Sequence, residues 1–482
     1  MTHLWTAEEI IEATDGRPLG TIPEGIGGIS IDSRTLAPGD AFFAIKGDAM
    51  DGHDFVTAAA AAGAALFVVA EGKLPALGRL NIPMIVVPDV LVALEKLGVA
   101  ARKRTKAKII AVTGSAGKTS TKEALRHCLS TVGSVHASDK SFNNHWGVPL
   151  SLARMRADCK FAIFEIGMNH ADEIRPLVKM VRPHVALITL VAAAHLGHFK
   201  SLAEIARAKG EIFDGLVSGG TALINRDDAH WKTLEKDAVS AGVKNIAFFG
   251  EHVRSTYRLL DFKLHSDYST IAARIGGNEI LARIGAPGRH MVQNALAVLA
   301  CAHLVGAALP PVALALGDLQ AEAGRGKRYR LRHPKGAFTL IDESYNANPA
   351  SMKAALSLLK AMQIPERGKR IAVLGDMLEL GSYSEKLHSE LGELIVDAGA
   401  QRVFLGGEAM KALAGSMPKG LKFEYREKTD DLLPLVMAAI RPGDAIVVKS
   451  SKSTGFSRIV DAILKQFPVD DGAARASGQV RG

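Results

Sequence analysis

The chain has 482 residues, of which 48% are hydrophobic and 23% are charged. This length exceeds that of one typical core and indicates about three domains, while the composition is ordinary for a soluble globular protein. The net charge of +9 permits contact with polyanions, but the basic residues are spread along the chain and aromatic residues make up only 5%, so we expect small anionic substrates rather than nucleic acid.

The cysteine pattern and the hydropathy pattern indicate a cytoplasmic protein. Cys128, Cys159 and Cys301 lie far apart within apolar stretches, which is neither a metal-binding spacing nor a disulfide framework and is typical of a reducing compartment. No stretch approaches the roughly 18 uninterrupted apolar residues of a spanning helix. Residues 1–16 predict an acidic amphipathic helix rather than a signal peptide.

Residues 1–100 predict a small α/β module. Apolar runs predict an alanine-rich helix at 55–63 and four strands, at residues 29–31, 41–45, 65–70 and 84–87. Polar clusters follow the strands at residues 32–34, 46–47 and 51–53. Ligands bind at strand ends in α/β folds, but Asp, Ser and Gly are also common in turns for conformational reasons. The spacing alone leaves both interpretations open.

The basic segment 102–108, RKRTKAK, is interpreted as a solvated linker to the middle region. Residues 109–112 then predict a buried strand, which turns through two glycines into a helix that begins at about Lys118. Such a turn directs backbone N–H groups toward one point, which suits phosphate. Lys118 would add a positive charge and the Thr119 hydroxyl could ligate Mg²⁺. The strict phosphate-loop pattern requires glycine at Val112, yet the flanking strand and helix still favour nucleotide phosphate over an ordinary corner.

Three further polar side chains of the middle region are of interest. Glu165 lies near the end of a predicted strand at 161–166, and because an unpaired buried carboxylate is costly we favour a Mg²⁺ ligand over a salt bridge. His195 follows the next predicted strand and could be a core histidine or a ligand. Lys209 lies in a predicted helix at 201–216, where position alone favours a solvated lysine. The apolar face of that helix is expected to comprise Leu202, Ile205, Ile212 and Phe213.

Two other segments place polar groups near helix starts. Residues 141–150, SFNNHWGVPL, carry adjacent asparagines that predict either a ligand-facing loop or a structural Asx turn. A further helix is expected at 294–302. Beyond residue 326, strands alternate with helices and predict a parallel, doubly wound sheet. The strands are expected at 338–341, 370–374, 402–405 and 445–448, and the helices at 352–362 and around His388.

Several of these blocks resemble those of the Mur ligase family. They are TGSAGKTSTKE (113–123), SFNNHWGVPLSL (141–152), RAKGEIF (207–213), IDESYNANPASM (341–352), and VLGDMLELG (373–381) with Ser384 and His388. The first matches the shortened phosphate loop of that family, which accounts for Val112. Residues 31–55 are similar to the family module that holds the UDP-sugar end of the substrate.

The resemblance implies an α/β fold of three domains. These are an N-terminal UDP-sugar-binding domain (1–100), a central ATP-binding domain with a phosphate loop on a parallel sheet (101–325) and a C-terminal Rossmann-like domain (326–468), followed by a disordered tail (469–482). It implies a cytoplasmic, monomeric ligase of peptidoglycan precursor synthesis, with neither nucleic acid nor membrane as a partner. The enzyme would join D-alanyl-D-alanine to UDP-N-acetylmuramoyl-tripeptide through an acyl phosphate made with ATP.

The resemblance also implies roles for individual residues. Lys118, Lys209 and His195 would be catalytic, and Lys209 would be carbamylated by CO₂, which reverses the interpretation that its position alone favours. Two Mg²⁺ ions would be held by Thr119, Glu165, His195 and carbamylated Lys209. The residues implied to bind ATP are Gly114, Ser115, Ala116, Gly117, Lys118, Thr119, Ser120, Asn294, Arg325 and Asp342. Those implied to bind the other substrates are Ser33, Arg34, Lys46, Asn143, Asn144, Asn346 and Asn348. Asp376 and Glu379 are expected on the acceptor side or in domain closure.

Some positions depart from the family pattern, namely Leu190 with its neighbours, Met291, Glu343 and Ser450–Lys452. These changes surround retained metal and phosphate residues, so they affect fine geometry more than reaction class.

Two alternative functions remain. Another ligase of the same scaffold, such as a tripeptide-forming Mur ligase or folylpolyglutamate synthetase, is disfavoured by the blocks at 342–349 and 375–381. A catalytically silent nucleotide-binding protein is disfavoured by the joint presence of Lys118, Thr119, Glu165, His195 and Lys209. The sequence leaves open whether the third residue of the tripeptide is meso-diaminopimelate or lysine.

Overall fold

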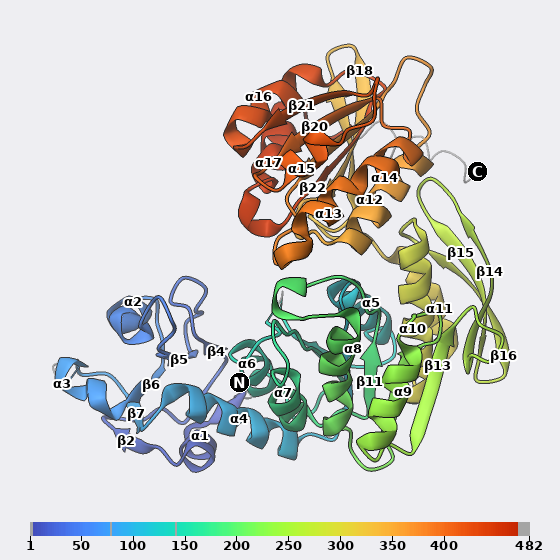
Figure 1. Cartoon of the computed structure of the whole chain (residues 1–482). Helices are drawn as coiled ribbons and strands as arrows, with labels where there is room; N and C mark the ends of the chain where they lie inside the picture. The colour runs from blue at the N-terminus through green and yellow to red at the C-terminus, as the bar shows by residue number, and fades with distance from the viewer. Residues whose placement is uncertain (1–2, 78–79, 140–141, 471–482) are drawn as a thin grey trace, which may run out of the picture.

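The computed structural model describes residues 3–77, 80–139 and 142–470. Within them the strands form sheets of five, nine and six strands and one two-stranded pair. In Figure 1 the blue N-terminal residues lie to the left of the green middle region, and the orange and red C-terminal residues stand above it. Three predictions fall partly outside the described residues: those for the first two residues, for Ser141 and for the tail beyond residue 470.

The first region contains a mostly parallel five-stranded sheet of order β2-β7-β6-β5-β4, in which only β2 is antiparallel. Its expected strands are present because each is a short apolar run buried on the sheet. The strands are β1 (Trp5–Thr6), β2 (Arg17–Leu19), β3 (Gly25–Ile26), β4 (Ile29–Ser30), β5 (Ala41–Phe43), β6 (Leu66–Ala70) and β7 (Met84–Val87). The helices are α1 (Ala7–Thr14), α2 (Val56–Ala61), α3 (Leu74–Leu77) and α4 (Val90–Arg104). Helix α1 is shorter than predicted because Thr6 and Glu9 form a capping box that fixes its start.

The prediction of a solvated linker at 102–108 is wrong for residues 102–104, whereas Lys103, Lys106 and Lys108 are exposed as expected. Residues 102–104 form the last turn of α4, a helix that the sequence analysis did not anticipate. Arg102 donates hydrogen bonds to the backbone carbonyls of Val181 and Arg182, and Arg104 lies 3.3 Å above the centre of the Trp5 ring. Long basic side chains can bury their stems while their polar ends find carbonyl or aromatic partners. This turn therefore connects the first and middle regions rigidly.

The middle region is built on a nine-stranded sheet of order β16-β15-β14-β13-β12-β11-β8-β10-β9. Strands from β9 to β14 in this order are parallel, and β14, β15 and β16 form an antiparallel ribbon that was not predicted. The strands are β8 (Lys108–Thr113), β9 (Val135–Ala137), β10 (Phe161–Glu165), β11 (Val185–Ile188), β12 (Thr221–Asn225), β13 (Asn245–Gly250), β14 (Tyr257–Leu264), β15 (Ser269–Ile275) and β16 (Asn278–Ile284). The helices are α5 (Lys118–Leu129), α6 (Gly147–Ala153), α7 (Ile174–Val181), α8 (Leu202–Gly210), α9 (Trp231–Ser240), α10 (Arg289–Leu304) and α11 (Leu309–Ala315).

Strand β8 shows why this sheet has a core on both faces. Its alternate residues point to opposite sides: Ile110 and Val112 pack with the apolar residues of α5 and α10, whereas Ile109 and Ala111 join the cluster formed by α4, α6 and α7. A parallel strand covered by helices on both faces must be apolar at every position. The continuous run at 109–112 was therefore a reliable signal.

The third region is a six-stranded sheet of order β17-β18-β22-β19-β20-β21, parallel except for β17. The strands are β17 (Lys327–His333), β18 (Gly336–Glu343), β19 (Arg370–Gly375), β20 (Arg402–Gly406), β21 (Lys422–Arg426) and β22 (Ala445–Lys449). The helices are α12 (Pro349–Ala361), α13 (Ser384–Ser389), α14 (Leu391–Asp397), α15 (Met410–Gly415), α16 (Thr429–Ala439) and α17 (Ser457–Gln466). At the start of the predicted tail, Val469 bridges to Leu331 and Asp470 pairs with Arg330, so these two residues pack on β17.

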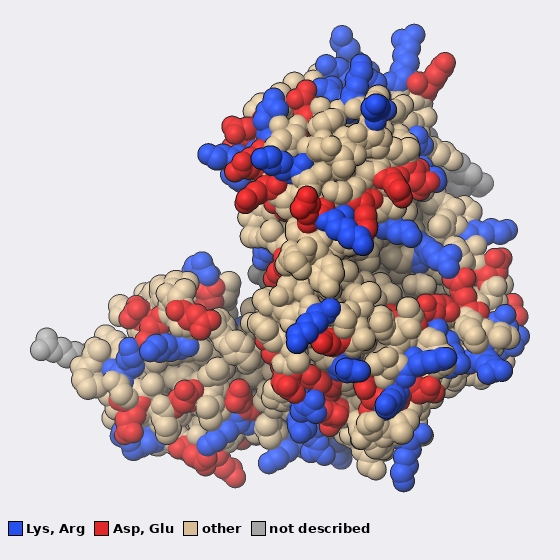
Figure 2. Space-filling model, in the orientation of Figure 1, with Lys and Arg blue, Asp and Glu red and all other residues tan. Residues whose placement is uncertain are grey.

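The α/β prediction with parallel sheets is confirmed, with the antiparallel ribbon as an addition. All three cysteines are free and buried. Among the described residues there is no helix with the length and apolar character needed to cross a bilayer. On the face drawn in Figure 2, Lys and Arg are interspersed with Asp and Glu rather than gathered on one surface.

Candidate functional site

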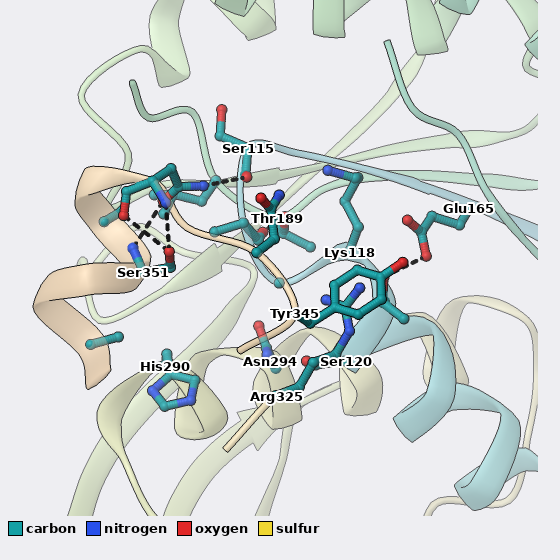
Figure 3. A pocket seen from close by; sticks show the side chains of 18 of the residues that line it. Ser115, Lys118, Ser120, Glu165, Thr189, His290, Asn294, Arg325, Tyr345 and Ser351 are labelled. Atoms are coloured by element: carbon teal, nitrogen blue, oxygen red, sulfur yellow. Dashed lines mark hydrogen bonds between the residues drawn. The ribbon is translucent and has the colours of Figure 1, made fainter. Parts of the chain in front are cut away.

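A cavity lies where the carboxyl ends of β8, β10 and β11 meet α10 and the segment that follows β18. Figure 3 shows Ser115, Lys118, Glu165, Asn294, Arg325 and Tyr345 arranged around it. The predicted residues that line this cavity are Ser115, Ala116, Gly117, Lys118, Thr119, Ser120, Asn143, Glu165, His195, Asn294, Arg325, Asn346 and Asn348. Most of the residues assigned to ATP and metal are therefore brought together at the C-terminal edge of a parallel sheet, where α/β proteins bind ligands.

The phosphate loop is held open by bonds to the strand beside it. Ser115 donates its N–H to the Leu190 carbonyl at 2.7 Å, and the Thr189 hydroxyl donates to the Ala116 carbonyl at 2.6 Å. Gly114 has φ of +151° and lies against Thr189, so a side chain there would be both strained and obstructed. Gly117 has φ of +81° and begins α5. The free N–H groups of that helix end point at the cavity and provide an anion site.

Two lysines of this region have their pKa values lowered by their surroundings. Lys118 Nζ donates to the Gly114 carbonyl at 2.7 Å, and burial lowers its pKa, an effect that Glu165 opposes and Arg325 reinforces. Lys209 is only 2% exposed. Burial, and then the charge of Lys118, lower the pKa of Lys209 well below its usual value. The solvated position that the sequence alone favoured for Lys209 is thus wrong, although its helix does begin as expected, at Leu202.

The helix around Lys209 differs from the prediction at its C-terminal end. The α-helix α8 stops at Gly210 and continues as a 3₁₀ turn over Glu211–Gly215. Ile205, Ile212 and Phe213 are buried as expected, whereas Leu202 is 38% exposed. The departure from the expected apolar face is thus confined to Leu202, the first residue of α8.

Glu165 is held by two neighbours. Its Oε2 accepts from the Thr119 hydroxyl at 2.8 Å, and its Oε1 accepts from Asn143 Nδ2 at 2.8 Å. Glu165 as a whole residue is only 1% exposed. Its carboxylate therefore does not form a salt bridge at the protein surface. A hydroxyl oxygen and a carboxylate oxygen side by side are the ligand types that Mg²⁺ prefers. Among the described residues, no cluster of three or more His, Cys, Asp or Glu side chains could hold a metal by itself.

His195 reaches the cavity from the loop after β11 and faces the third region. Its Nδ1 lies 2.6 Å from Oε2 of Glu379, and the angle of this contact is not that of a good hydrogen bond. His195 and Glu379 both have positive φ, 60° and 63°. The His195 side chain therefore lines the cavity and also contacts the third region.

The residues assigned to the nucleotide lie on two sides of the cavity. Asn294 on α10 lies beside Gly117, and the Arg325 guanidinium lies 4.1 Å from the centre of the Tyr345 ring. Asp342 does not line the cavity. It is 3% exposed and accepts hydrogen bonds from the N–H groups of Gly324 and Ser344, so it shapes the turn that carries Arg325.

The predicted asparagines have different surroundings. Asn144 forms an Asx turn before α6, since its Oδ1 accepts from the N–H groups of Trp146 at 3.3 Å and Gly147 at 3.0 Å, and it does not line the cavity; here the Asx-turn alternative holds. Asn346 lines the cavity. Asn348 caps α12 and also donates from Nδ2 to the Ser115 carbonyl at 3.2 Å. This last bond links the third region directly to the phosphate loop.

Other predicted residues lie away from the cavity. Ser33 and Arg34 follow β4, and exposed Arg34 pairs with Asp32 at 2.7 Å. Lys46 is exposed on a turn whose next residue, Gly47, lies against Trp146. These residues could therefore contact only a ligand that extends well beyond the phosphate loop.

The 373–381 block is largely structural except at Glu379. Asp376 accepts from Met410 N–H at 2.9 Å, and burial raises its pKa. His388 is fully buried and its Nε2 accepts from Met377 N–H at 3.0 Å. These side chains fix the loop that presents Glu379 to His195.

Sequence reasoning missed several cavity residues. Buried Lys449 donates to the Asn346 carbonyl at 2.8 Å and pairs with Glu343 at 3.2 Å. Thr189 and His290 also line the cavity. The only signal was positional, because Lys449 ends a strand and His290 begins a helix. Glu343, which is one of the departures from the family pattern, is thus paired with Lys449, which directly precedes another.

Comparisons with known proteins give a consistent result along the chain. A family model described as "Mur ligase family, catalytic domain" matches residues 25–132, one described as "Mur ligase middle domain" matches 112–302, and one described as "Mur ligase, glutamate ligase domain" matches 327–452.

Individual relatives match over almost the whole chain. The UDP-N-acetylmuramoyl-tripeptide–D-alanyl-D-alanine ligase of Escherichia coli strain K12 is 35% identical over 438 residues, covering 90% of this chain and 93% of its own. The protein of the same name from Rickettsia prowazekii strain Madrid E is 34% identical, covering 90% and 94%. A crystal structure of MurF from Acinetobacter baumannii superimposes with a TM-score of 0.83 at 30% identity, covering 96% and 99%.

Proposed function

The chain belongs to the Mur ligase family, and we propose that it joins D-alanyl-D-alanine to UDP-N-acetylmuramoyl-tripeptide while ATP is cleaved to ADP and phosphate. The observation that carries this proposal is the single cavity in which the phosphate loop, Glu165, Asn294 and Arg325 converge. The identity to relatives of that specificity over 90% of the chain supports the choice of substrates. The reaction belongs to cytoplasmic peptidoglycan precursor synthesis.

The chemistry must overcome the low reactivity of a carboxylate. ATP transfers its terminal phosphoryl group to the tripeptide carboxylate and ADP leaves. The dipeptide amine then attacks the acyl phosphate carbon, loses a proton, and inorganic phosphate leaves as the peptide bond forms. Anionic groups crowd together in the first step, so fixed N–H donors and cations stabilise the transition state. The α5 N-terminus and Lys118 supply them here, and Arg325 adds a second cation from the opposite wall.

The oxygen ligands at the loop fit Mg²⁺. Thr119 and Glu165 would hold one ion, and His195 with Glu165 would hold a second. Mg²⁺ is usually bound by one or two carboxylates together with substrate phosphates, so a pre-formed cluster of carboxylates is not needed. When bound, the ion neutralises charge on the phosphate oxygens. Asn143 fixes the carboxylate of Glu165 in the orientation that leaves it facing Thr119.

Lys209 fits a carbamate. An amine adds to CO₂ only when it is unprotonated, and the buried surroundings of Lys209 favour that form. The product releases a proton and is anionic, so it replaces repulsion from Lys118 with attraction. Among the described residues no carboxylate pairs with Lys209, which leaves its amine available.

The remaining assignments are also proposals. The first region, residues 1–100, would hold the UDP-sugar end, and the boundaries of the other two domains would lie near residues 100, 325 and 468. Ser33, Arg34 and Lys46 would contact that end of the substrate, which extends from the cavity past Trp146. The protein would act as a monomer in the cytoplasm.

Phosphate release tests the function directly. Purified protein is assayed with ATP, Mg²⁺, UDP-N-acetylmuramoyl-tripeptide and D-alanyl-D-alanine, and each component is omitted in turn. We expect phosphate only when all are present, and we expect Lys118→Met to abolish it. Equal release without the dipeptide, or none with the complete mixture, would refute the proposal. Parallel assays with lysine-containing and meso-diaminopimelate-containing tripeptides identify the third residue.

A further inference from the structure

Two loops from different regions dock against each other beside the cavity. Residues 195–200 follow β11, and residues 379–383 follow β19. The N–H of Gly197 donates to the Glu379 carbonyl at 2.8 Å, and the Tyr383 hydroxyl donates to the Lys200 carbonyl at 3.3 Å. A Cβ placed on Gly381 would lie 2.7 Å from the Gly197 Cα, so the two backbones approach as closely as glycine permits. We call this contact the interdomain joint.

The joint contains two residues with costly backbone conformations. His195 and Glu379 are both left-handed in φ although neither is glycine, which costs on the order of 1 kcal/mol each and persists only where the surroundings impose it. Their side chains meet, with His195 Nδ1 at 2.6 Å from Glu379 Oε2. Nδ1 is buried, whereas the Glu379 side chain is 49% exposed. Glu379 therefore contributes little to the core, and its carboxylate instead contacts the imidazole.

We propose that Glu379 is a positioning residue for His195, delivered to the active site by docking of the C-terminal domain. The inference rests on the function proposed above. An acidic side chain on one imidazole nitrogen fixes the ring and its tautomer and leaves the other nitrogen for a ligand. His195 lines the cavity, so Nε2 is the nitrogen left for it. The catalytic arrangement is then complete only when both sides of the joint are in contact.

The surroundings of the pair agree with this role. The His198 ring packs against His170 at 4.3 Å between centroids, which supports the loop that carries His195. The present angle at Nδ1 is imperfect, and such contacts commonly tighten when the substrate complex forms.

Four variants test whether Glu379 orients the His195 ring or whether the joint only holds the two domains together. Glu379→Ala removes the carboxylate, and Glu379→Gln keeps a hydrogen-bond acceptor. Gly381→Ala leaves the carboxylate in place but obstructs the joint, because Gly381 has φ of +56° and faces the Gly197 backbone. Gly399→Ala is the matched control. Gly399 has a similar φ of +64° in the same domain, and its Cβ would meet nothing nearer than 3.9 Å.

Two measurements are made on each full-length variant. The first is kcat and KM for phosphate release. The second is the ¹⁵N spectrum of histidine rings in ¹⁵N-histidine-labelled protein with ADP and Mg²⁺, in which the His195 signals are assigned by their loss in His195→Gln. We expect Glu379→Ala and Gly381→Ala to lower kcat about 10- to 100-fold, the usual effect of losing an outer partner of a ligand histidine, and to shift the His195 ring signals toward the other tautomer. Glu379→Gln should restore most of both readouts, and Gly399→Ala should change neither.

The outcomes distinguish this inference from the proposed function. Wild-type kcat in both Glu379→Ala and Gly381→Ala would overturn it. A lowered kcat with unchanged His195 ring signals would also overturn it, since the joint would then only hold the two domains together without orienting the His195 ring. If the wild-type protein failed to make product but its His195 signals still shifted in Glu379→Ala, the contact would stand and the proposed function would fail.

Discussion

Replacement of Lys209 by Met is expected to make the protein more stable and inactive at the same time. Lys209 is 2% exposed, and its pKa is lowered by burial and by Lys118. Met is similar in length and carries no charge. Replacing buried charges with apolar groups of similar volume commonly stabilises by about 1–4 kcal/mol even where the charges are paired. We expect the lower end, about 1 kcal/mol, because some packing is lost. For a domain of this size that corresponds to a rise in Tm of about 2–4 °C.

Calorimetry with and without CO₂ gives the decisive measurement. In CO₂-depleted buffer Lys209→Met should melt above the wild type. Added bicarbonate should raise the Tm of the wild type, because the carbamate is attracted to Lys118, and should leave the variant unchanged. Phosphate release by the variant should fall about 10²- to 10³-fold, as when one electrostatic group of an active site is removed, and acetate should partly restore release in Lys209→Ala.

Lys122→Met provides the matched control. Lys122 is also fully buried, but its Nζ donates to the Ser138 carbonyl at 2.7 Å and pairs with Glu123 at 2.8 Å. Its replacement leaves these partners unsatisfied and should lower stability by about 1–3 kcal/mol. The reasoning is refuted if Lys209→Met is less stable than the wild type without CO₂, or if bicarbonate affects both proteins alike.

Three more outcomes follow from single contacts. Gly114→Ala should lose nucleotide binding in calorimetric titration and about 1–3 kcal/mol of stability, because φ of +151° and Thr189 both oppose a side chain; unchanged binding would contradict this. Asn348→Ala should cost about 1 kcal/mol in urea unfolding through loss of the α12 cap and should raise KM for ATP, whereas a pure capping role would leave KM unchanged. Burial first, and then nearby positive charge, lower the pKa of His184 from 6.5 to about 4. The unfolded chain therefore binds the extra proton between those pH values, so wild-type stability should fall as pH drops from 6.5 to 4. His184→Gln should lose that part of the slope in a series of melts; parallel curves would count against it.

The sequence predicted the elements whose cause is local. Buried parallel strands such as those at 84–87 and 161–165 are short apolar runs, and no other structure suits such runs between turns. The phosphate loop was found because its glycines and Lys118 act through backbone geometry within a few residues. Glu165 was found because a lone acid in an apolar strand requires an explanation.

The elements that were missed depend on distant partners. Helix α4 and its basic last turn are explained by Trp5 and by the carbonyls after α7, which no local pattern reveals. The ribbon β14–β16 is only half-buried and carries charged residues, so its apolar signal was weak. The burial of Lys209 was not predicted, since the family resemblance implied only its carbamylation, and the contact of His195 with Glu379 arises only from the docking of two sheets.

The hydrogen bond from Asn348 to the Ser115 carbonyl has a consequence for turnover. Because the loop proposed to bind phosphate is also bonded to the third region, occupancy of the loop and attachment of that region would be linked equilibria. Linkage is reciprocal. If bound nucleotide raises the equilibrium constant for attachment by some factor, attachment raises the affinity for nucleotide by the same factor. ADP would then leave fastest from an enzyme whose loop has already separated from Asn348. Breaking this one hydrogen bond would therefore weaken both nucleotide binding and attachment of the third region.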